Sequence, residues 1–389
     1  MAFFEELLIL LTGALLLSIT LLRFNIPTLV AYICVGAAVG PFALNWVSDP
    51  SAFSFLAEFG VVFLLFALGL EFSGEKLWKL RKTVFGVGGV QVGACCLIFT
   101  AAVYLWGTHL ESAILIAGAL ALSSTAIVSK ELTQSKQLQT KAGHLSISVL
   151  LFQDLAAVVF LILIPVFSGQ GDMPLVQSLG LALGKGIILF VLLLSIGQWV
   201  LPFVYKEVAR DGSDEIFVLS TLVICLLSAW LTHSFHLSMA LGSFIIGMML
   251  GESPFKQQIE IDIRPFKHIL LSLFFMTIGM NIDLTLIPEF WLRLLLFTGA
   301  LLVIKTIAVA SVVLWLKTPA NDAIKVGLYL SQAGEFGIAL ITLAKMHNIL
   351  PSDQASFIIL IAVFSMMLSP WIMQHSNKIT NALQRRSPL

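Results

Sequence analysis

Residues 148–159 read SVLLFQDLAAVV and place Gln153 and Asp154 inside an apolar run that extends from about Leu145 to Phe167. A run of this length can cross a bilayer as a helix. A carboxylate at that depth costs roughly 2.5–3.5 kcal/mol on insertion scales, so it needs a partner or a water-filled cavity. We therefore interpret Asp154 as an ion-binding or proton-carrying group. The alternative is a structural acid that is hydrogen-bonded to a neighbouring helix.

The composition of the 389-residue chain is that of a membrane protein, with 58% hydrophobic residues, 11% charged residues and a mean hydropathy of +0.99. Its repeated apolar runs of about 20 residues predict an all-α polytopic protein, because only helices and closed barrels satisfy their backbone in lipid. The runs lack the alternation of barrel strands. Lys+Arg and Asp+Glu are 22 each, so the net charge gives no sign of a nucleic-acid partner. The four cysteines fall inside apolar runs, which favours packing roles over disulfides or metal ligands.

The apolar runs divide the chain into about thirteen candidate transmembrane spans joined by short loops. The predicted spans are 3–22, 28–47, 53–71, 83–106, 112–130, 143–168, 177–204, 214–232, 236–251, 267–287, 291–316, 321–346 and 354–376. All but four of the 22 Lys and Arg residues fall in alternate loops or in the C-terminal tail; the exceptions are Lys185, Arg293, Lys305 and Lys345. By the positive-inside rule, this asymmetry predicts a cytoplasmic C-terminus and an N-terminus outside the cell.

Two of these spans carry polar interruptions in matching places. The fifth contains LSSTA at Leu122–Ala126, and the twelfth contains LSQAGEFG at Leu330–Gly337. If the seventh span is a connector, each interrupted span is the fifth of a six-span half, and the two halves have opposite topology. This pattern predicts an inverted repeat with two discontinuous helices that cross near the midplane. The alternative is two continuous helices in which Ser and Thr bond back to the backbone and the glycines serve packing.

Two further patterns give smaller expectations. Gly251–Lys267, GESPFKQQIEIDIRPFK, is expected to be the longest charged loop, either a solvated linker or a docking segment for a regulatory domain. The pairs Gly36/Gly40 and Gly89/Gly93 have the GxxxG spacing and are expected to be helix-packing contacts.

Five motifs, in order, resemble Kef-type potassium/proton antiporters of the monovalent cation:proton antiporter-2 family. They are SSTAIVSKEL at 123–132, SVLLFQDLAAV at 148–158, HLSMALGSFIIGMMLGESPF at 236–255, IEIDIRPFKHILLSLFFMTIGMNID at 259–283 and SQAGEFG at 331–337. The resemblance covers essentially the whole chain.

This resemblance implies a sodium/proton-antiporter-like fold of thirteen spans over residues 1–376, in a homodimer of the bacterial inner membrane. Spans 1–3 and 8–10 would form a dimerisation scaffold, spans 4–6 and 11–13 an ion-transporting core, and span 7 a connector. Residues 377–389 would be a cytoplasmic tail or the start of a linker.

Kef-type proteins usually continue into a Rossmann-like nucleotide-binding domain, and the glycines at 86–89 lack the spacing and context of such a domain. We expect no cofactor in this chain. A nucleotide or glutathione regulator would come only with a further C-terminal domain or an ancillary subunit. The chain is then either naturally short or the transmembrane part of a longer protein.

The expected ion site centres on Asp154, which would hold either a proton or a monovalent cation. Hydroxyl and carbonyl oxygens of Ser123, Ser124 and Thr125 would help to replace the water shell of the cation. Gln153 is neutral at a position where paired-acid antiporters carry a second acid, which suggests one proton per cation and electroneutral exchange. The alternative is that Lys305 gives up a proton when the cation binds, which would change this stoichiometry.

Two crossing broken helices also leave four half-helix ends close together, positive at their N-termini and negative at their C-termini. Asp154, Lys305 and Glu335 are candidates for balancing these ends. For Lys305 and Glu335 a purely structural role stays open.

The leading functional hypothesis is potassium/proton exchange that supports potassium efflux by alternating access. Sodium/proton exchange is the alternative within the same class. A ligand-gated potassium channel is a second alternative, although the sequence lacks a TVGYG filter. A sodium-coupled symporter would need a larger polar cavity, and no nucleophile–base pair or metal cluster suggests an enzyme.

Overall fold

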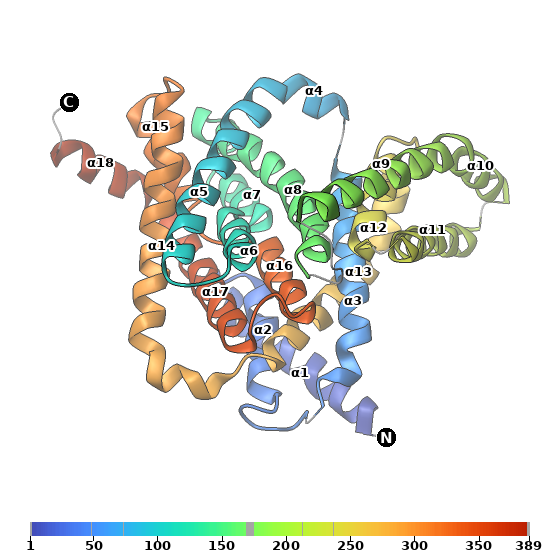
Figure 1. Ribbon diagram of the computed structural model, residues 1–389, viewed down its shortest axis with the longest axis horizontal. Helices are drawn as coiled ribbons and strands as arrows, with labels where there is room; N and C mark the ends of the chain where they lie inside the picture. The colour runs from blue at the N-terminus through green and yellow to red at the C-terminus, as the bar shows by residue number, and fades with distance from the viewer. Residues whose placement is uncertain are drawn as a thin grey trace.

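The computed structural model describes residues 2–47, 49–72, 74–168, 175–211, 213–235 and 237–386. Within these ranges the protein is entirely helical (Figure 1), which confirms the all-α prediction. Nine helical stretches of the described residues are long and apolar enough to cross a membrane, some of them made of two or more consecutive helices, and two shorter helices are also apolar. The count of thirteen spans stays a prediction.

The helices follow one another along the chain with short connections. They are α1 (Ala2–Leu22), α2 (Thr28–Val39), α3 (Ser51–Glu71), α4 (Gly74–Thr83), the π-helix η1 (Val84–Gly88), α5 (Gly89–Leu105), α6 (Leu110–Ala121), α7 (Thr125–Gln134), α8 (Lys141–Phe167), α9 (Leu175–Trp199), α10 (Leu201–Asp211), α11 (Asp214–Ser234), α12 (Met239–Gly251), α13 (Lys256–Met280), the 3₁₀ turn η2 (Leu284–Leu286), α14 (Ile287–Trp315), α15 (Ala320–Tyr329), α16 (Glu335–Met346), α17 (Ser352–Gln374) and α18 (Ser376–Arg386).

Both predicted interruptions are breaks in the helices. The fifth predicted span is divided into α6 and α7, and Ser124 caps α7 by accepting a hydrogen bond from the N–H of Ile127 at 3.2 Å. The twelfth is divided into α15 and α16, with Gly334 in an extended conformation just before α16. Serine is a favoured N-cap because its hydroxyl accepts from the first turn, and this local chemistry restarts the helix after the break.

The helices pack in two groups. The first comprises α1, α2, α3, α11, α12 and α13, and the second comprises α5 to α8 with α14 to α17. Helix α9 contacts α8 of the second group and α12 of the first. The groups also meet directly where α8 contacts α12 and where α17 contacts α2. In Figure 1, α14 and α15 lie at one side of the molecule and α10 and α11 at the opposite side.

Of the two GxxxG pairs, the first fits its prediction. A Cβ on Gly36 would lie 1.9 Å from the backbone oxygen of Met276, so α2 and α13 touch backbone to backbone there. The prediction was wrong for Gly93, whose Cβ position has nothing within 4 Å. Spacing alone identifies a helix face on which backbones can approach closely, but a neighbour must also lie against that face.

Two predicted boundaries are corrected by the structure. The expected loop Gly251–Lys267 is mostly helix, because α13 begins at Lys256 and buries Ile259 and Ile263, one turn apart, against the first group. The expected span 28–47 is helical only to Val39, after which the chain turns.

Candidate functional site

Asp154 lies on α8 inside the helical packing, with 3% of its surface exposed. The hydroxyl of Thr125, the first residue of α7, donates to the carboxylate at 3.1 Å from Oδ1 and 3.3 Å from Oδ2. Among the described residues, this hydroxyl is the one hydrogen-bond donor that reaches Asp154. A carboxylate so poorly solvated by the protein needs a proton or a cation to be stable in this position.

Gln153, the neighbour of Asp154, turns toward the first break. Its Oε1 accepts the backbone N–H of Ser123 at 2.7 Å, and its Nε2 donates to Oε1 of Gln91 at 2.9 Å. Gln91 lies on α5, is fully buried, and was not among the predicted site residues. The signal that could have identified it is its amide, a strongly polar group within a long apolar span.

The three predicted hydroxyls have different partners. Ser123 donates to the backbone oxygen of Leu330 at 2.9 Å, which links the first break to the second. Ser124 caps α7 through Ile127, as described above. Only the hydroxyl of Thr125 contacts Asp154.

Lys305 is fully buried on α14 and lies between the two breaks. Its Nζ donates to the backbone oxygen of Leu122 at 2.8 Å and to that of Gln332 at 2.7 Å. These two residues are structurally matched, since each lies three positions before the next half-helix begins, at Thr125 and at Glu335. One ammonium group therefore donates to the C-cap carbonyl of α6 and to a carbonyl of the break that follows α15.

Glu335 begins α16 and is buried, with 8% of its surface exposed. The neighbouring Gly334 lies against Ser123 and Ser124, so the acid is near the N-terminal ends of both second half-helices. Its Oε2 has no hydrogen-bond partner among the described residues. Two buried acids, Asp154 and Glu335, therefore lie near the starts of the second half-helices.

The two breaks cross at backbone distance. A Cβ on Gly334 would lie 2.6 Å from the carbonyl carbon of Ser123 and 2.8 Å from the backbone nitrogen of Ser124. The crossing places Asp154 and Glu335 at the N-terminal ends of the second half-helices, and Lys305 at the C-terminal end of α6 and in the break after α15. This is the distribution of charge that opposes the helix dipoles.

The site is not sealed by the helical packing, because Thr125 is half-buried and Ala126 is exposed. Glu71 at the end of α3 pairs with Lys267 of α13 at 3.8 Å, and both side chains are partly exposed. Asp154 lies near the boundary between the two helix groups, because its helix α8 contacts α12 of the first group.

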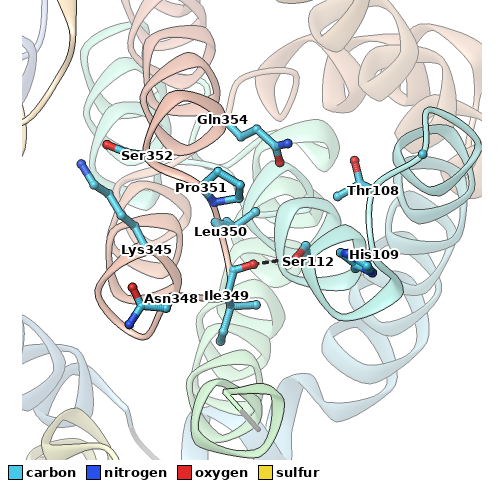
Figure 2. Close-up of a pocket in the computed structure, with 11 residues that line it drawn as sticks. Thr108, His109, Ser112, Lys345, Asn348, Ile349, Leu350, Pro351, Ser352 and Gln354 are labelled. Carbon is cyan, nitrogen blue, oxygen red and sulfur yellow. Dashed lines mark hydrogen bonds between the residues drawn. The ribbon is translucent and has the colours of Figure 1, made fainter.

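A separate cavity of about 630 Å³ lies at the loops that precede α6 and α17 (Figure 2). Two of the segments that line it are joined by a hydrogen bond, in which the hydroxyl of Ser112 donates to the backbone oxygen of Ile349 at 2.8 Å. None of the predicted site residues lines this cavity. The described residues also contain no group of three or more His, Cys, Asp or Glu arranged to hold a metal ion.

Comparison with known proteins is consistent with this geometry. Residues 7–374 match the family described as "Sodium/hydrogen exchanger, transmembrane". The fold is similar to that of the sodium proton antiporter MjNhaP1 from Methanocaldococcus jannaschii at pH 8, with a TM-score of 0.67, 16% identity and 98% of each chain covered. At this identity the similarity shows the fold alone.

Curated relatives are more similar in sequence. The chain is 37% identical over 358 residues to "Putative K(+) efflux antiporter KefB" of Alkalimonas amylolytica, which covers 92% of this chain and 54% of that protein. It is 39% identical over 353 residues to "K(+) efflux antiporter 2, chloroplastic" of Arabidopsis thaliana, which covers 88% of this chain and 30% of that protein. The chain thus spans about half, or less, of the length of these relatives.

Proposed function

Since the chain belongs to the sodium/hydrogen exchanger transmembrane family, we propose that it exchanges a monovalent cation for a proton across a membrane. The observation that carries this proposal is the buried carboxylate of Asp154, which receives one hydroxyl donor beside two crossing helix breaks. A transporter of this kind uses broken helices to present helix ends and oxygen ligands to an ion at the midplane.

In the proposed mechanism, Asp154 binds the cation when it is ionised and releases the cation when it takes up a proton. Either ligand removes the cost of an uncompensated charge in a buried position, and both cannot be held together stably. The hydroxyl of Thr125 and nearby backbone oxygens supply further ligands of the type that hard cations prefer.

The exchange is proposed to be electroneutral, with one proton per cation. Gln153 is neutral, and Lys305 is hydrogen-bonded to two backbone carbonyls rather than to Asp154. In this proposal Lys305 and Glu335 balance the charges of the helix ends, and neither gains or loses a proton during transport.

Potassium is the proposed cation, because the curated relatives described above are named as K(+) efflux antiporters. Sodium is the second candidate, favoured by the family description and by the name of the structural neighbour, a sodium proton antiporter. The oxygen ligands available at Asp154 suit either ion.

Alternating access is proposed to occur by movement of the second helix group against the first. The first group, with spans 1–3 and 8–10, would be the scaffold of a homodimer, and α9 would be the connector. We further propose that the C-terminus is cytoplasmic, that the protein lies in the bacterial inner membrane, and that regulation comes from another domain or subunit. The division of the packing into two groups supports this proposal.

The test is proton flux into proteoliposomes that contain the full chain, driven by outward gradients of potassium, sodium, rubidium or lithium. We expect potassium to drive the fastest flux, with the same rate whether or not the membrane voltage is clamped. Liposomes that contain Asp154→Asn control for leak and should show only background flux, because an amide cannot exchange a proton.

Three results would contradict the proposal. Unchanged flux in Asp154→Asn would exclude the shared carboxylate. A cation current that persists without proton movement would indicate a channel instead. A rate that depends on voltage would exclude one-for-one exchange.

A further inference from the structure

We infer that Gln91 is a positioning residue of the ion site, which acts through Gln153 to fix the first helix break. This inference rests on the proposed function, because the fixed break is the one that presents Thr125 to Asp154. Gln91 lies on α5, is fully buried and contacts neither Asp154 nor the break directly.

The direction of each amide follows from one backbone donor. The N–H of Ser123 can only donate, so Oε1 of Gln153 must face it, as it does at 2.7 Å. The amide nitrogen of Gln153 must then face Gln91, which has to present its own oxygen, and the two atoms lie 2.9 Å apart. The nitrogen of Gln91 consequently points the other way and donates to Sγ of Cys95 at 3.3 Å.

All three polar side-chain groups in this chain of contacts are buried, so the hydrogen bonds have no competition from water. Without the oxygen of Gln91, the amide nitrogen of Gln153 would lose its partner in an apolar environment. Rotation of that amide would in turn release the N–H of Ser123, which lies two residues before the hydroxyl that contacts Asp154. Residues that hydrogen-bond to the ligand residues of a metal site hold those ligands in place, and their loss typically lowers the affinity for the metal about 10–100-fold.

Two features of the backbone near Gln91 place this residue close to α8. The π-helical turn η1 lies immediately before α5, and π-turns change the direction in which the following residues face. At its end, a Cβ on Gly88 would lie 2.4 Å from Cβ of Phe152, so this helix and α8 touch directly beside Gln153. This close approach is what lets two short amide side chains meet.

The experiment measures potassium-driven proton flux in proteoliposomes for wild type, Gln91→Met, Gln153→Met and the double variant. Methionine preserves the length of glutamine and removes both polar atoms. We expect Gln91→Met to raise the half-saturating potassium concentration about tenfold, with a smaller change in maximal rate. This factor is in the range measured when a residue that hydrogen-bonds to a metal ligand is lost. In the Gln153→Met background the same change should add nothing further. Gln258→Met, on the exposed face of α13, is the matched control and should leave the half-saturating concentration unchanged.

Two additional variants test the role of the oxygen itself. Gln91→Glu, with its buried acid protonated, keeps an oxygen at the position that accepts from Gln153 and should lose less potassium affinity than Gln91→Met. Gln91→Asn is one methylene shorter and should behave like Gln91→Met, and it replaces Gln91→Met if that variant does not accumulate in the membrane.

The inference is overturned if the Gln91 variants leave the half-saturating concentration unchanged while wild type transports. It is equally overturned if Gln91→Met has its full effect in the Gln153→Met background. Absence of cation-driven flux in wild type would instead refute the proposed function, so the two failures are distinguishable.

Discussion

The two helix breaks share a backbone arrangement and differ in their side chains. In each, the backbone carbonyl three residues before the second half-helix accepts from Lys305. In each, one backbone N–H donates to a side chain of the long helix that follows the break. The N–H of Ser123 donates to Gln153 at 2.7 Å, and the N–H of Ala333 donates to Ser365 at 3.1 Å. The common contacts explain how both breaks are tolerated at membrane depth, where an unpaired backbone group is costly.

The differences concern the ionisable groups. The first break presents the hydroxyl of Thr125 to Asp154, whereas the second carries Glu335 at the matching start of its half-helix. The long helix after the second break offers the small hydroxyl of Ser365, and no acid lies beside it in the sequence. The comparison teaches that the two breaks share their backbone contacts, whereas the exchange proposed above would depend on the few side chains that differ between them.

The largest expected effect comes from the residue that the breaks share. Lys305→Met removes two charge-assisted hydrogen bonds to buried carbonyls, so at about 1.5–3 kcal/mol for each bond the free energy of unfolding should fall by about 3–6 kcal/mol. Thermal unfolding of the purified protein in detergent measures this loss. Lys185→Met, on α9 and away from both breaks, is the control. Equal melting temperatures for the two variants would mean that the ammonium does not hold the breaks together.

The second prediction separates the breaks by their effect on the ion. Thr125→Val keeps the shape of the side chain but removes the donor to Asp154, and hydrogen bonds to charged groups contribute about 1.5–3 kcal/mol. The half-saturating potassium concentration in flux assays should rise by roughly 10–100-fold, which is this energy expressed as an equilibrium constant. Thr342→Val, in the second half-helix α16, removes a hydroxyl that bonds only its own helix and should have no such effect. The same affinity in both variants would contradict the assignment of the site to the first break.

The third prediction concerns the distance between the breaks. Gly334→Ala would place a Cβ 2.6 Å from the carbonyl carbon of Ser123 and should cost about 1–3 kcal/mol as overpacking, because backbone cannot yield as a side chain can. Melting temperature again measures the effect. Gly93→Ala, whose Cβ position has open space around it, is the control. If both substitutions are tolerated equally, the breaks do not cross at backbone distance.

The smallest expected effect is at the second break. Ser365→Ala removes the acceptor of the N–H of Ala333 and should lower the unfolding free energy by about 1 kcal/mol, the low end of the range for a single buried donor left unpaired. It should leave the half-saturating potassium concentration unchanged, in contrast to Gln153→Met at the equivalent contact. A comparable loss of potassium affinity in both variants would show that the second break also takes part in ion binding.

Much of the fold and part of the site were predictable from sequence. Apolar runs predict helices in a membrane because lipid leaves the backbone no other partner. Polar residues within such runs mark the depth of Asp154 and the positions of both breaks, and the breaks lie within a few residues of those positions. The charged stretch after α12 was wrongly expected to be a loop, because its charges concealed the buried pair Ile259 and Ile263.

What sequence could not supply is the direction of each side chain. Position along a helix fixes the depth of a residue, whereas its neighbour depends on how separate helices rotate against one another. The sequence therefore determined that Asp154 is buried amid apolar residues between two interrupted spans. Only the tertiary structure decided that Gln153 points to Ser123 and Gln91, and that Lys305 reaches both breaks, because those contacts join helices far apart in the chain.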